Sequence, residues 1–245
     1  MTNHFLKVFL RILIVIPVFS FAQSVQQDTT FLASSIVQAK KIYGYAAQGQ
    51  AQLYNGTDYA DYKSYKDEHP YFISDDWELS TVEYSGEYFE NVPILYNISS
   101  DKVISEHFYS SNKMQLISEL IGSFTFQNRQ FVRLTEEPSK ASSIKTGFYE
   151  VLHNGKTKAY VKRIKVLQEK ISSDEHIVSF DEKNRFFIYK NGGYFEVSSK
   201  GSILQVFSDK KQELKHFLKE NHIRFKSSKE KALIAMTIYY DTITR

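Results

Sequence analysis

The stretch that decides the fold is FTFQNRQFVRL, residues 124–134. Two short runs rich in aromatic and β-branched residues lie on either side of the pair Gln127-Asn128, and asparagine is among the residues that tolerate a tight turn. We therefore expect two antiparallel strands joined by a turn at this pair.

The same pattern recurs on both sides of this stretch. Two further hairpins are expected, from Phe148–Leu152 with Ala159–Val166 and from Phe186–Tyr189 with Tyr194–Val197. Residues 80–108 hold two or three more candidate strands, and Pro93 among them indicates an edge strand or a bend. Because hairpin follows hairpin, the sheet is predicted to be mainly antiparallel.

Helical patterns flank the predicted strands. Residues 29–48 carry apolar side chains three and four apart, which is typical of an amphipathic helix. After residue 202 this spacing returns: Ser208-Asp209 can begin one helix, and Ser227 with Glu230 forms the capping-box pattern of another. The sequence predicts an α+β fold: an N-terminal helix, a mainly antiparallel β-sheet built from successive hairpins, and two or three short C-terminal helices packed on it.

Residues 23–245 are expected to form a single α+β domain, because two short helices cannot bury their own apolar faces without the sheet. The second choice is a subdivision near 136–145, a segment with Pro138 and several serines.

Residues 1–22 have the layout of a secretory signal peptide. Lys7 and Arg11 precede the apolar run Ile12–Phe19, and Ser20-Phe21-Ala22 suits cleavage after Ala22. An uncleaved anchor is the alternative, although the run is shorter than the ~20 apolar residues that span a membrane. We expect an exported protein, in the periplasm, associated with the outer membrane, or secreted.

Charge is distributed unevenly along the chain. The whole sequence has 31 Lys+Arg and 28 Asp+Glu residues, but acidic residues outnumber basic ones from Gln23 to Gly155 and the reverse holds from Lys156 to Lys231. A basic C-terminal part can bind an anionic partner, such as a membrane surface or another protein. The candidate patch consists of four lysines: Lys210, Lys211, Lys215 and Lys219. The alternative is ordinary solvated charge that the fold partly compensates.

One segment combines aromatic and acidic residues around the only tryptophan, Trp77. Such side chains can form a ligand platform, for example for sugar stacking. The candidate platform consists of Trp77, Tyr59, Tyr62, Tyr65, Tyr71, His69, Asp75 and Asp76. The alternative is that these aromatic residues pack in the sheet, because half-buried strands select them.

The sequence sets several chemistries aside. With no cysteine there are no disulfides, no thiolate nucleophile and no lipoprotein anchor. No two histidines have the H-x-x-x-H spacing, and Gly-x-Ser-x-Gly, a Walker A loop and Gly-x-Gly-x-x-Gly are absent. We therefore predict no catalytic residue, no metal and no cofactor, and an exported address disfavours nucleic acid as a partner. A hydrolase whose two carboxylates meet only in space stays open.

Several segments resemble a group of exported proteins from Bacteroidota with no assigned activity. They are the leader ending Ser20-Phe21-Ala22-Gln23, Leu53–Gly56, His69–Phe72, Asn91–Tyr96, Lys210–Leu214 and Tyr239–Asp241. The resemblance implies an address in the bacterial envelope and one conjoined domain, and it carries over no site residue.

From these observations we expect a non-enzymatic exported envelope protein that binds a partner, an envelope protein or glycan, or a ligand. The alternatives are a hydrolase acting on glycan or peptide, and an accessory factor that docks on an anionic membrane face or protein through its basic C-terminal helices.

Overall fold

The computed structural model describes residues 35, 53, 55–60, 68–107, 112–136, 143–171, 176–225 and 228–244, without the side chains of 176 and 177. The predicted signal peptide, nearly all of the predicted N-terminal helix, and Tyr62 and Tyr65 lie outside these ranges. All elements below belong to one compact unit, Gly49–Arg245.

The described residues form an antiparallel sheet of eleven strands in the order β1-β5-β4-β3-β2-β6-β7-β8-β9-β12-β13. The strands are β1 (Thr57–Asp58), β2 (Glu78–Tyr84), β3 (Glu87–Asn97), β4 (Lys102–Glu106), β5 (Lys113–Gln115), β6 (Ile121–Phe126), β7 (Arg129–Leu134), β8 (Gly147–Asn154), β9 (Lys158–Lys162), β12 (Arg185–Lys190) and β13 (Gly193–Val197). A short 3-10 turn, η2 (Ser118–Leu120), precedes β6.

The hairpin predicted at residues 124–134 is confirmed as β6 and β7. Phe124 faces Phe131 across the pair, and the turn residues Gln127 and Asn128 have φ of 46° and 60°. Positive φ at both turn positions matches the right-handed twist of the flanking strands, which is why two-residue turns of this kind are favoured.

Two sequence predictions about strands need correction. Pro93 lies in β3, between β2 and β4, so the edge alternative is wrong, whereas the irregularity of β3 next to it fits the alternative of a bend. The register shifts beside it, where β3 places an extra residue opposite β2 and Asn91 has φ of 57°, so the missing N–H falls next to a bulge. The predicted strand Ala159–Val166 is split, because β9 ends at Lys162 and a separate strand begins at Lys165.

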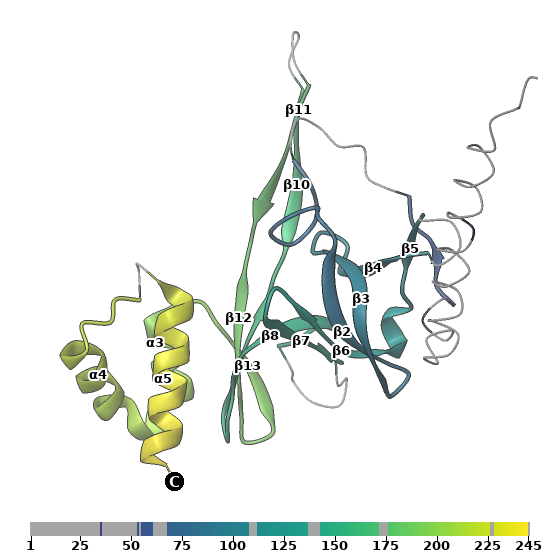
Figure 1. Ribbon diagram of the computed structural model, residues 1–245. Helices are drawn as coiled ribbons and strands as arrows, with labels where there is room; N and C mark the ends of the chain where they lie inside the picture. The colour runs from purple at the N-terminus through teal and green to yellow at the C-terminus, as the bar shows by residue number, and fades with distance from the viewer. Residues whose placement is uncertain are drawn as a thin grey trace, which may run out of the picture. The chain divides into compact units, whose positions relative to one another are not determined.

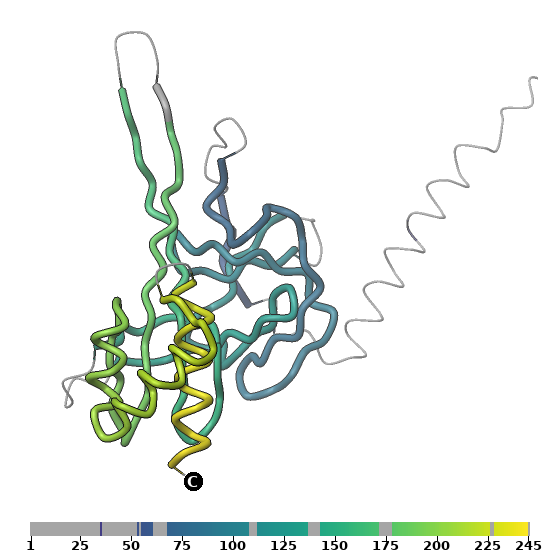
Figure 2. The backbone as a smooth tube through the Cα atoms, turned by 90° about the vertical axis from the view of Figure 1, so that its left-hand side faces the viewer, coloured from purple at the N-terminus to yellow at the C-terminus, as the bar shows by residue number. Residues whose placement is uncertain are grey.

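That separate strand, β10 (Lys165–Ile171), pairs with β11 (His176–Glu182) as a two-stranded ribbon outside the large sheet. The ribbon projects from the sheet in both views (Figures 1 and 2). Glu68 anchors it, because one carboxylate oxygen accepts a hydrogen bond from the Phe180 N–H at 3.0 Å.

The first core lies inside the curved part of the sheet. The Tyr96 ring of β3 packs edge-on against Phe124 of β6, Phe131 of β7 and Phe148 of β8, at centroid distances of 5.1, 5.1 and 6.1 Å. Because β3 and β8 are separated by three strands in the sheet order, this contact requires strong curvature.

The second core joins the sheet to three C-terminal helices, α3 (Lys200–Val206), α4 (Lys211–Glu220) and α5 (Lys229–Ile243). Ala159 and Ile188 of the sheet are fully buried in one cluster with Leu214, Leu233 and Met236 of the helices. The predicted α+β fold, with short C-terminal helices packed on the sheet, is therefore confirmed. Within the described ranges no helix combines the length and apolar character needed to cross a membrane.

Both predicted helix starts shift. Ser208 and Asp209 lie in a 3-10 turn, η3 (Ser208–Lys210), and α4 begins after Lys210 without a side-chain cap. The α5 cap is Ser228, one residue later than predicted, whose hydroxyl accepts from the Lys231 N–H. With Ser228 as the cap, the third helical residue is Lys231, so Glu230 stands one position too early for a capping box, and its carboxylate binds Arg163 instead.

Candidate functional site

Buried charges connect the sheet to α5. The Glu150 side chain, 4% exposed, lies between Arg129 and Arg163, with its oxygens 2.6 Å from each guanidinium. Arg163 also donates to Glu230 of α5 at 2.8 Å. Two positive and two negative groups compensate one another here, as burial of charge requires. We call these four residues, Arg129, Glu150, Arg163 and Glu230, the junction network, and we infer that they hold the helices on the sheet.

The carboxylates of the helical part, residues 200–244, are all engaged. Each contacts a basic side chain, a hydroxyl or a backbone N–H: Asp209 contacts Lys190 and Tyr240, Glu213 contacts Lys210, Glu220 contacts the His216 ring, Glu230 contacts Arg163, and Asp241 contacts the His153 ring and the Thr157 N–H. Several of these partners lie on the sheet, so much of this negative charge is used in fixing the helices.

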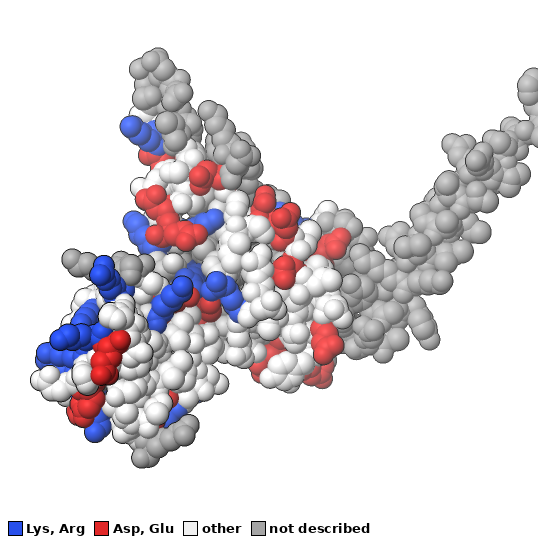
Figure 3. Space-filling model, turned by 60° about the vertical axis from the view of Figure 1, so that its left-hand side comes forward, with Lys and Arg blue, Asp and Glu red and all other residues white. Residues whose placement is uncertain are grey.

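The lysines of the same part are mostly left unmatched. Lys211, Lys215 and Lys219 are exposed and stand four residues apart on α4, so they form a row along one helix face. In the described part of the chain, no ion pair involves this lysine row, nor the exposed Lys200, Lys229 and Lys231. Lys210 of the predicted patch differs, because its ammonium lies 3.4 Å from Glu213. Figure 3 shows more blue than red over the helices, at the lower left.

Two members of the predicted aromatic platform lie near the same lysine, Lys113. Tyr71 is buried with Leu95 and Ile104, and its ring lies 5.1 Å from the Lys113 ammonium. Trp77 is 38% exposed, and its ring lies 6.0 Å from the same ammonium. The structure therefore brings Tyr71 and Trp77 near one lysine, with one ring used in packing and the other open to solvent.

The remaining described members of the platform have separate roles. The Tyr59 hydroxyl accepts from the Asn97 amide at 2.8 Å and lines a pocket of about 390 Å³ beside the ribbon. The His69 ring stacks on Tyr71, and burial is the largest cause that lowers the pKa of His69, which favours the neutral ring. Asp75 and Asp76 are exposed. No shared ligand cavity contains all of these described residues.

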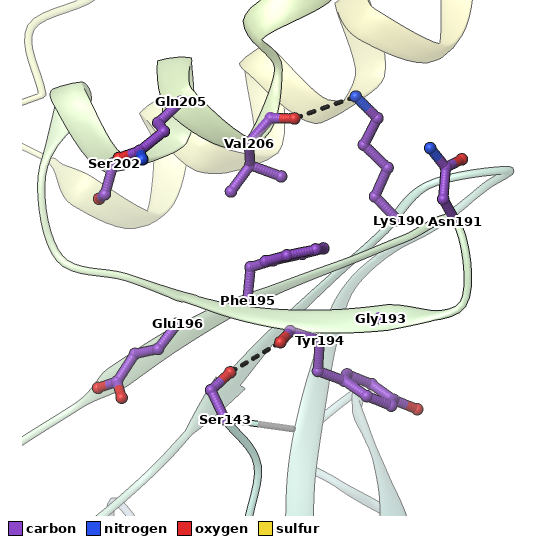
Figure 4. A pocket seen from close by; sticks show the side chains of 10 residues that line it. All are labelled: Ser143, Lys190, Asn191, Gly193, Tyr194, Phe195, Glu196, Ser202, Gln205 and Val206. Atoms are coloured by element: carbon purple, nitrogen blue, oxygen red, sulfur yellow. Dashed lines mark hydrogen bonds between the residues drawn. The ribbon is translucent and has the colours of Figure 1, made fainter. Parts of the chain in front are cut away.

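A larger pocket, about 690 Å³, lies between strand β13 and helix α3 (Figure 4). The Phe195 ring, 44% exposed, lies between its strand and Val206. Asn191 and Gln205 add exposed amides to the lining. Strand β13 ends the sheet order, and the Tyr194 carbonyl accepts from the Ser143 hydroxyl at 2.9 Å.

The charged groups of this pocket are already used. Lys190 donates to the Val206 carbonyl at 3.0 Å and to Asp209 at 2.7 Å. Glu196 accepts two hydrogen bonds from Arg185, at 2.8 and 2.6 Å, and this contact lowers the pKa of the Glu196 carboxyl. Among the described residues that line this pocket and the pocket beside the ribbon, Glu196 is the single carboxylate. These linings do not supply the carboxylate pair that glycoside hydrolysis uses.

Among the residues that the structure describes, no group of three histidine or acidic side chains is placed to hold a metal ion. No protein-family model matches the chain, and no curated protein or solved structure shows significant similarity to it.

Two lysines at helix starts were not predicted from the sequence as candidate site residues. Lys200 and Lys229 are the first residues of α3 and α5, and each follows a serine cap, Ser199 or Ser228. The signal was visible as a repeated Ser-Ser-Lys, at 198–200 and 227–229. Both lysines line a third pocket, between the starts of these helices.

Proposed function

We propose that the protein is a non-enzymatic binding protein of the bacterial envelope that docks on an anionic membrane surface through its C-terminal helices. The observation that carries this proposal is the imbalance of charge on those helices. Their carboxylates are engaged, whereas the lysine row on α4 has no recorded partner among the described residues.

A row of lysines on one helix face suits a planar surface, because its members can approach that surface together. Each lysine near an anionic membrane contributes about 1 kcal/mol, so the three members of the row supply about 3 kcal/mol. Such contacts are screened by salt, since exposed charges interact only over a Debye length of about 10 Å at 0.1 M. Binding should therefore be reversible and sensitive to salt.

Cosedimentation with vesicles tests this function. The chain without residues 1–22 should bind vesicles of phosphatidylcholine mixed with phosphatidylglycerol at low salt, and should release them at high salt. It should not bind vesicles of phosphatidylcholine alone. Equal binding to both kinds of vesicle, or none to the anionic kind, contradicts the proposal. Failure with vesicles but binding to a soluble acidic polysaccharide would replace the membrane with a glycan.

A matched pair of variants separates the lysine row from net charge. Lys211→Gln/Lys215→Gln removes two exposed charges from α4, and Lys170→Gln/Lys183→Gln removes two exposed charges in and beside the ribbon. The first should weaken vesicle binding at least about tenfold, and the second much less. Equal losses would show that only net charge matters.

A second candidate function is ligand binding in the pocket between β13 and α3. The observation that favours it is the half-exposed Phe195 ring next to two amides. A panel of oligosaccharides and short peptides, screened by thermal shift, should contain a stabilising member whose effect disappears in Phe195→Ala. A panel without effect, or a hit that survives the substitution, argues against this pocket.

A further inference from the structure

A pocket of about 890 Å³ lies where the starts of α3 and α5 meet the loop that follows α4. Its lining comes from three places: Ser198 to Gly201 at α3, Ile223 to Phe225 in the loop, and Lys229 at α5. This volume lies within the range of sites that hold small molecules.

The described lining carries three positive charges and no carboxylate. Lys200 and Lys229 supply two of these charges, and Arg224, which already interacts with another group, supplies the third. Glu230, the nearest acidic residue in the sequence, binds Arg163 of the junction network at 2.8 Å and is therefore already used. The pocket thus favours a ligand with concentrated negative charge, such as phosphate.

One wall of the pocket is apolar. Ile223 and Phe225 are partly buried and pack against the helical core. A backbone hydrogen bond from Ile223 to Leu218, at 3.0 Å, fixes the start of this wall to the end of α4. A small inorganic anion gains nothing from such a wall, whereas an anion attached to an apolar chain gains from both parts.

We propose that this pocket binds the phosphate headgroup of an anionic phospholipid. Lys200 and Lys229 contact the phosphate oxygens, and the start of the acyl chains lies against Ile223 and Phe225. The proposal rests on the proposed docking function, because the same helices must face the membrane. It adds a saturable site to a surface that would otherwise bind by diffuse attraction.

The direct test uses a soluble lipid, so that the membrane surface plays no part. Isothermal titration of the chain without residues 1–22 with dihexanoyl phosphatidylglycerol, below its micelle concentration, should show saturable binding of one lipid per chain. Dihexanoyl phosphatidylcholine and inorganic phosphate should each bind at least about tenfold more weakly, the first for lack of net charge and the second for lack of an apolar part.

Two pairs of variants with equal change of net charge locate the site. Lys200→Gln/Lys229→Gln should weaken binding of the soluble lipid at least about tenfold, and Lys211→Gln/Lys215→Gln should leave it unchanged. Phe225→Leu should weaken binding of the lipid but not that of inorganic phosphate. The urea midpoint of each variant verifies that it is folded.

The outcomes separate the two proposals. If the soluble lipid does not bind, if inorganic phosphate binds as tightly, or if both lysine pairs weaken binding equally, the pocket proposal is overturned. The docking function survives that result when anionic vesicles still bind the protein and the α4 pair still weakens the binding. If wild-type protein binds no anionic vesicle, the docking function is wrong, and saturable lipid binding alone would then support only the pocket.

Discussion

The junction network and the lysine row both consist of charged residues, but they use charge in opposite ways. In the junction network, side chains such as Arg163 and Glu150, 8% and 4% exposed, contact oppositely charged partners at 2.6 to 2.8 Å. In the lysine row, every side chain is exposed and no partner is recorded among the described residues. Burial forces charges to be matched, whereas exposed charge can stay unmatched at little cost to stability and is free to act on another molecule.

The largest expected effect comes from removing one partner of the junction network. Arg163→Met leaves Glu150 buried with one cation fewer and leaves Glu230 only its longer contact with Arg129, at 3.9 Å, so it should lower the free energy of unfolding by about 3–5 kcal/mol. Urea unfolding measures the loss. The control is Arg185→Met, which removes an exposed pair with Glu196 and should cost no more than about 1 kcal/mol. Similar losses in the two variants would refute the distinction between matched buried charge and exposed charge.

Alkaline pH should lower stability through buried tyrosines of the sheet and not through the exposed lysine row. Burial raises the pKa of Tyr160 to about 12 and that of Tyr96 well above its ordinary value. A raised folded-state pKa stabilises the protein fully below the unfolded pKa near 10, and this stability is lost as the pH rises toward the folded value. Urea midpoints should therefore fall between about pH 10 and 12.

Tyr160→Phe is the control for this pH dependence. The variant should show a shallower decline over the same interval, because one of the responsible groups is gone. An unchanged slope would mean that Tyr160 titrates alike in the folded and unfolded chains.

A smaller effect is expected at the start of α5, where the junction network and the helical surface meet. Ser228→Ala removes the hydroxyl that accepts from the Lys231 N–H, and should cost about 1 kcal/mol in urea unfolding. Ser208→Ala should cost much less, because the structure records no side-chain cap at η3 or at the start of α4. If Ser208→Ala cost more stability than Ser228→Ala, the helix start predicted from the sequence at Ser208-Asp209 would be supported instead.

The smallest effect on folding should come from the lysine row itself. Lys211→Gln/Lys215→Gln should change the free energy of unfolding by less than about 0.5 kcal/mol, because neither ammonium has a recorded contact to lose. A larger loss in urea would show that these lysines stabilise the fold, and would remove the reason to regard them as free for a partner.

Local signals in the sequence predicted the local parts of the fold. Gln127-Asn128 marked a tight turn between two aromatic runs, and the spacing of Leu214 and Leu218 marked a helix face that is buried. Errors arose where contacts from elsewhere decide the outcome. Glu230 fits a capping box by spacing, but Arg163, 67 residues away, takes its carboxylate.

The candidate sites were less predictable for the same reason. Lys210 and Lys211 are neighbours with the same charge. Of these two, Lys210 has an acidic partner, Glu213, which lies three residues later in the sequence. Likewise, the pocket between α3 and α5 brings together Lys200 and Lys229, which are far apart in the sequence. Which lysines stay unmatched depends on where the carboxylates go, and only the folded chain determines that.

The most direct measurement is made on the charge-reversed variant Lys211→Glu/Lys215→Glu, with vesicle affinity and urea midpoint determined on the same preparation. If the lysine row serves binding and the junction network serves folding, affinity for vesicles containing phosphatidylglycerol should be lost while the midpoint stays close to that of the wild type. Undiminished affinity, or a midpoint lowered as far as in Arg163→Met, would contradict this division of roles.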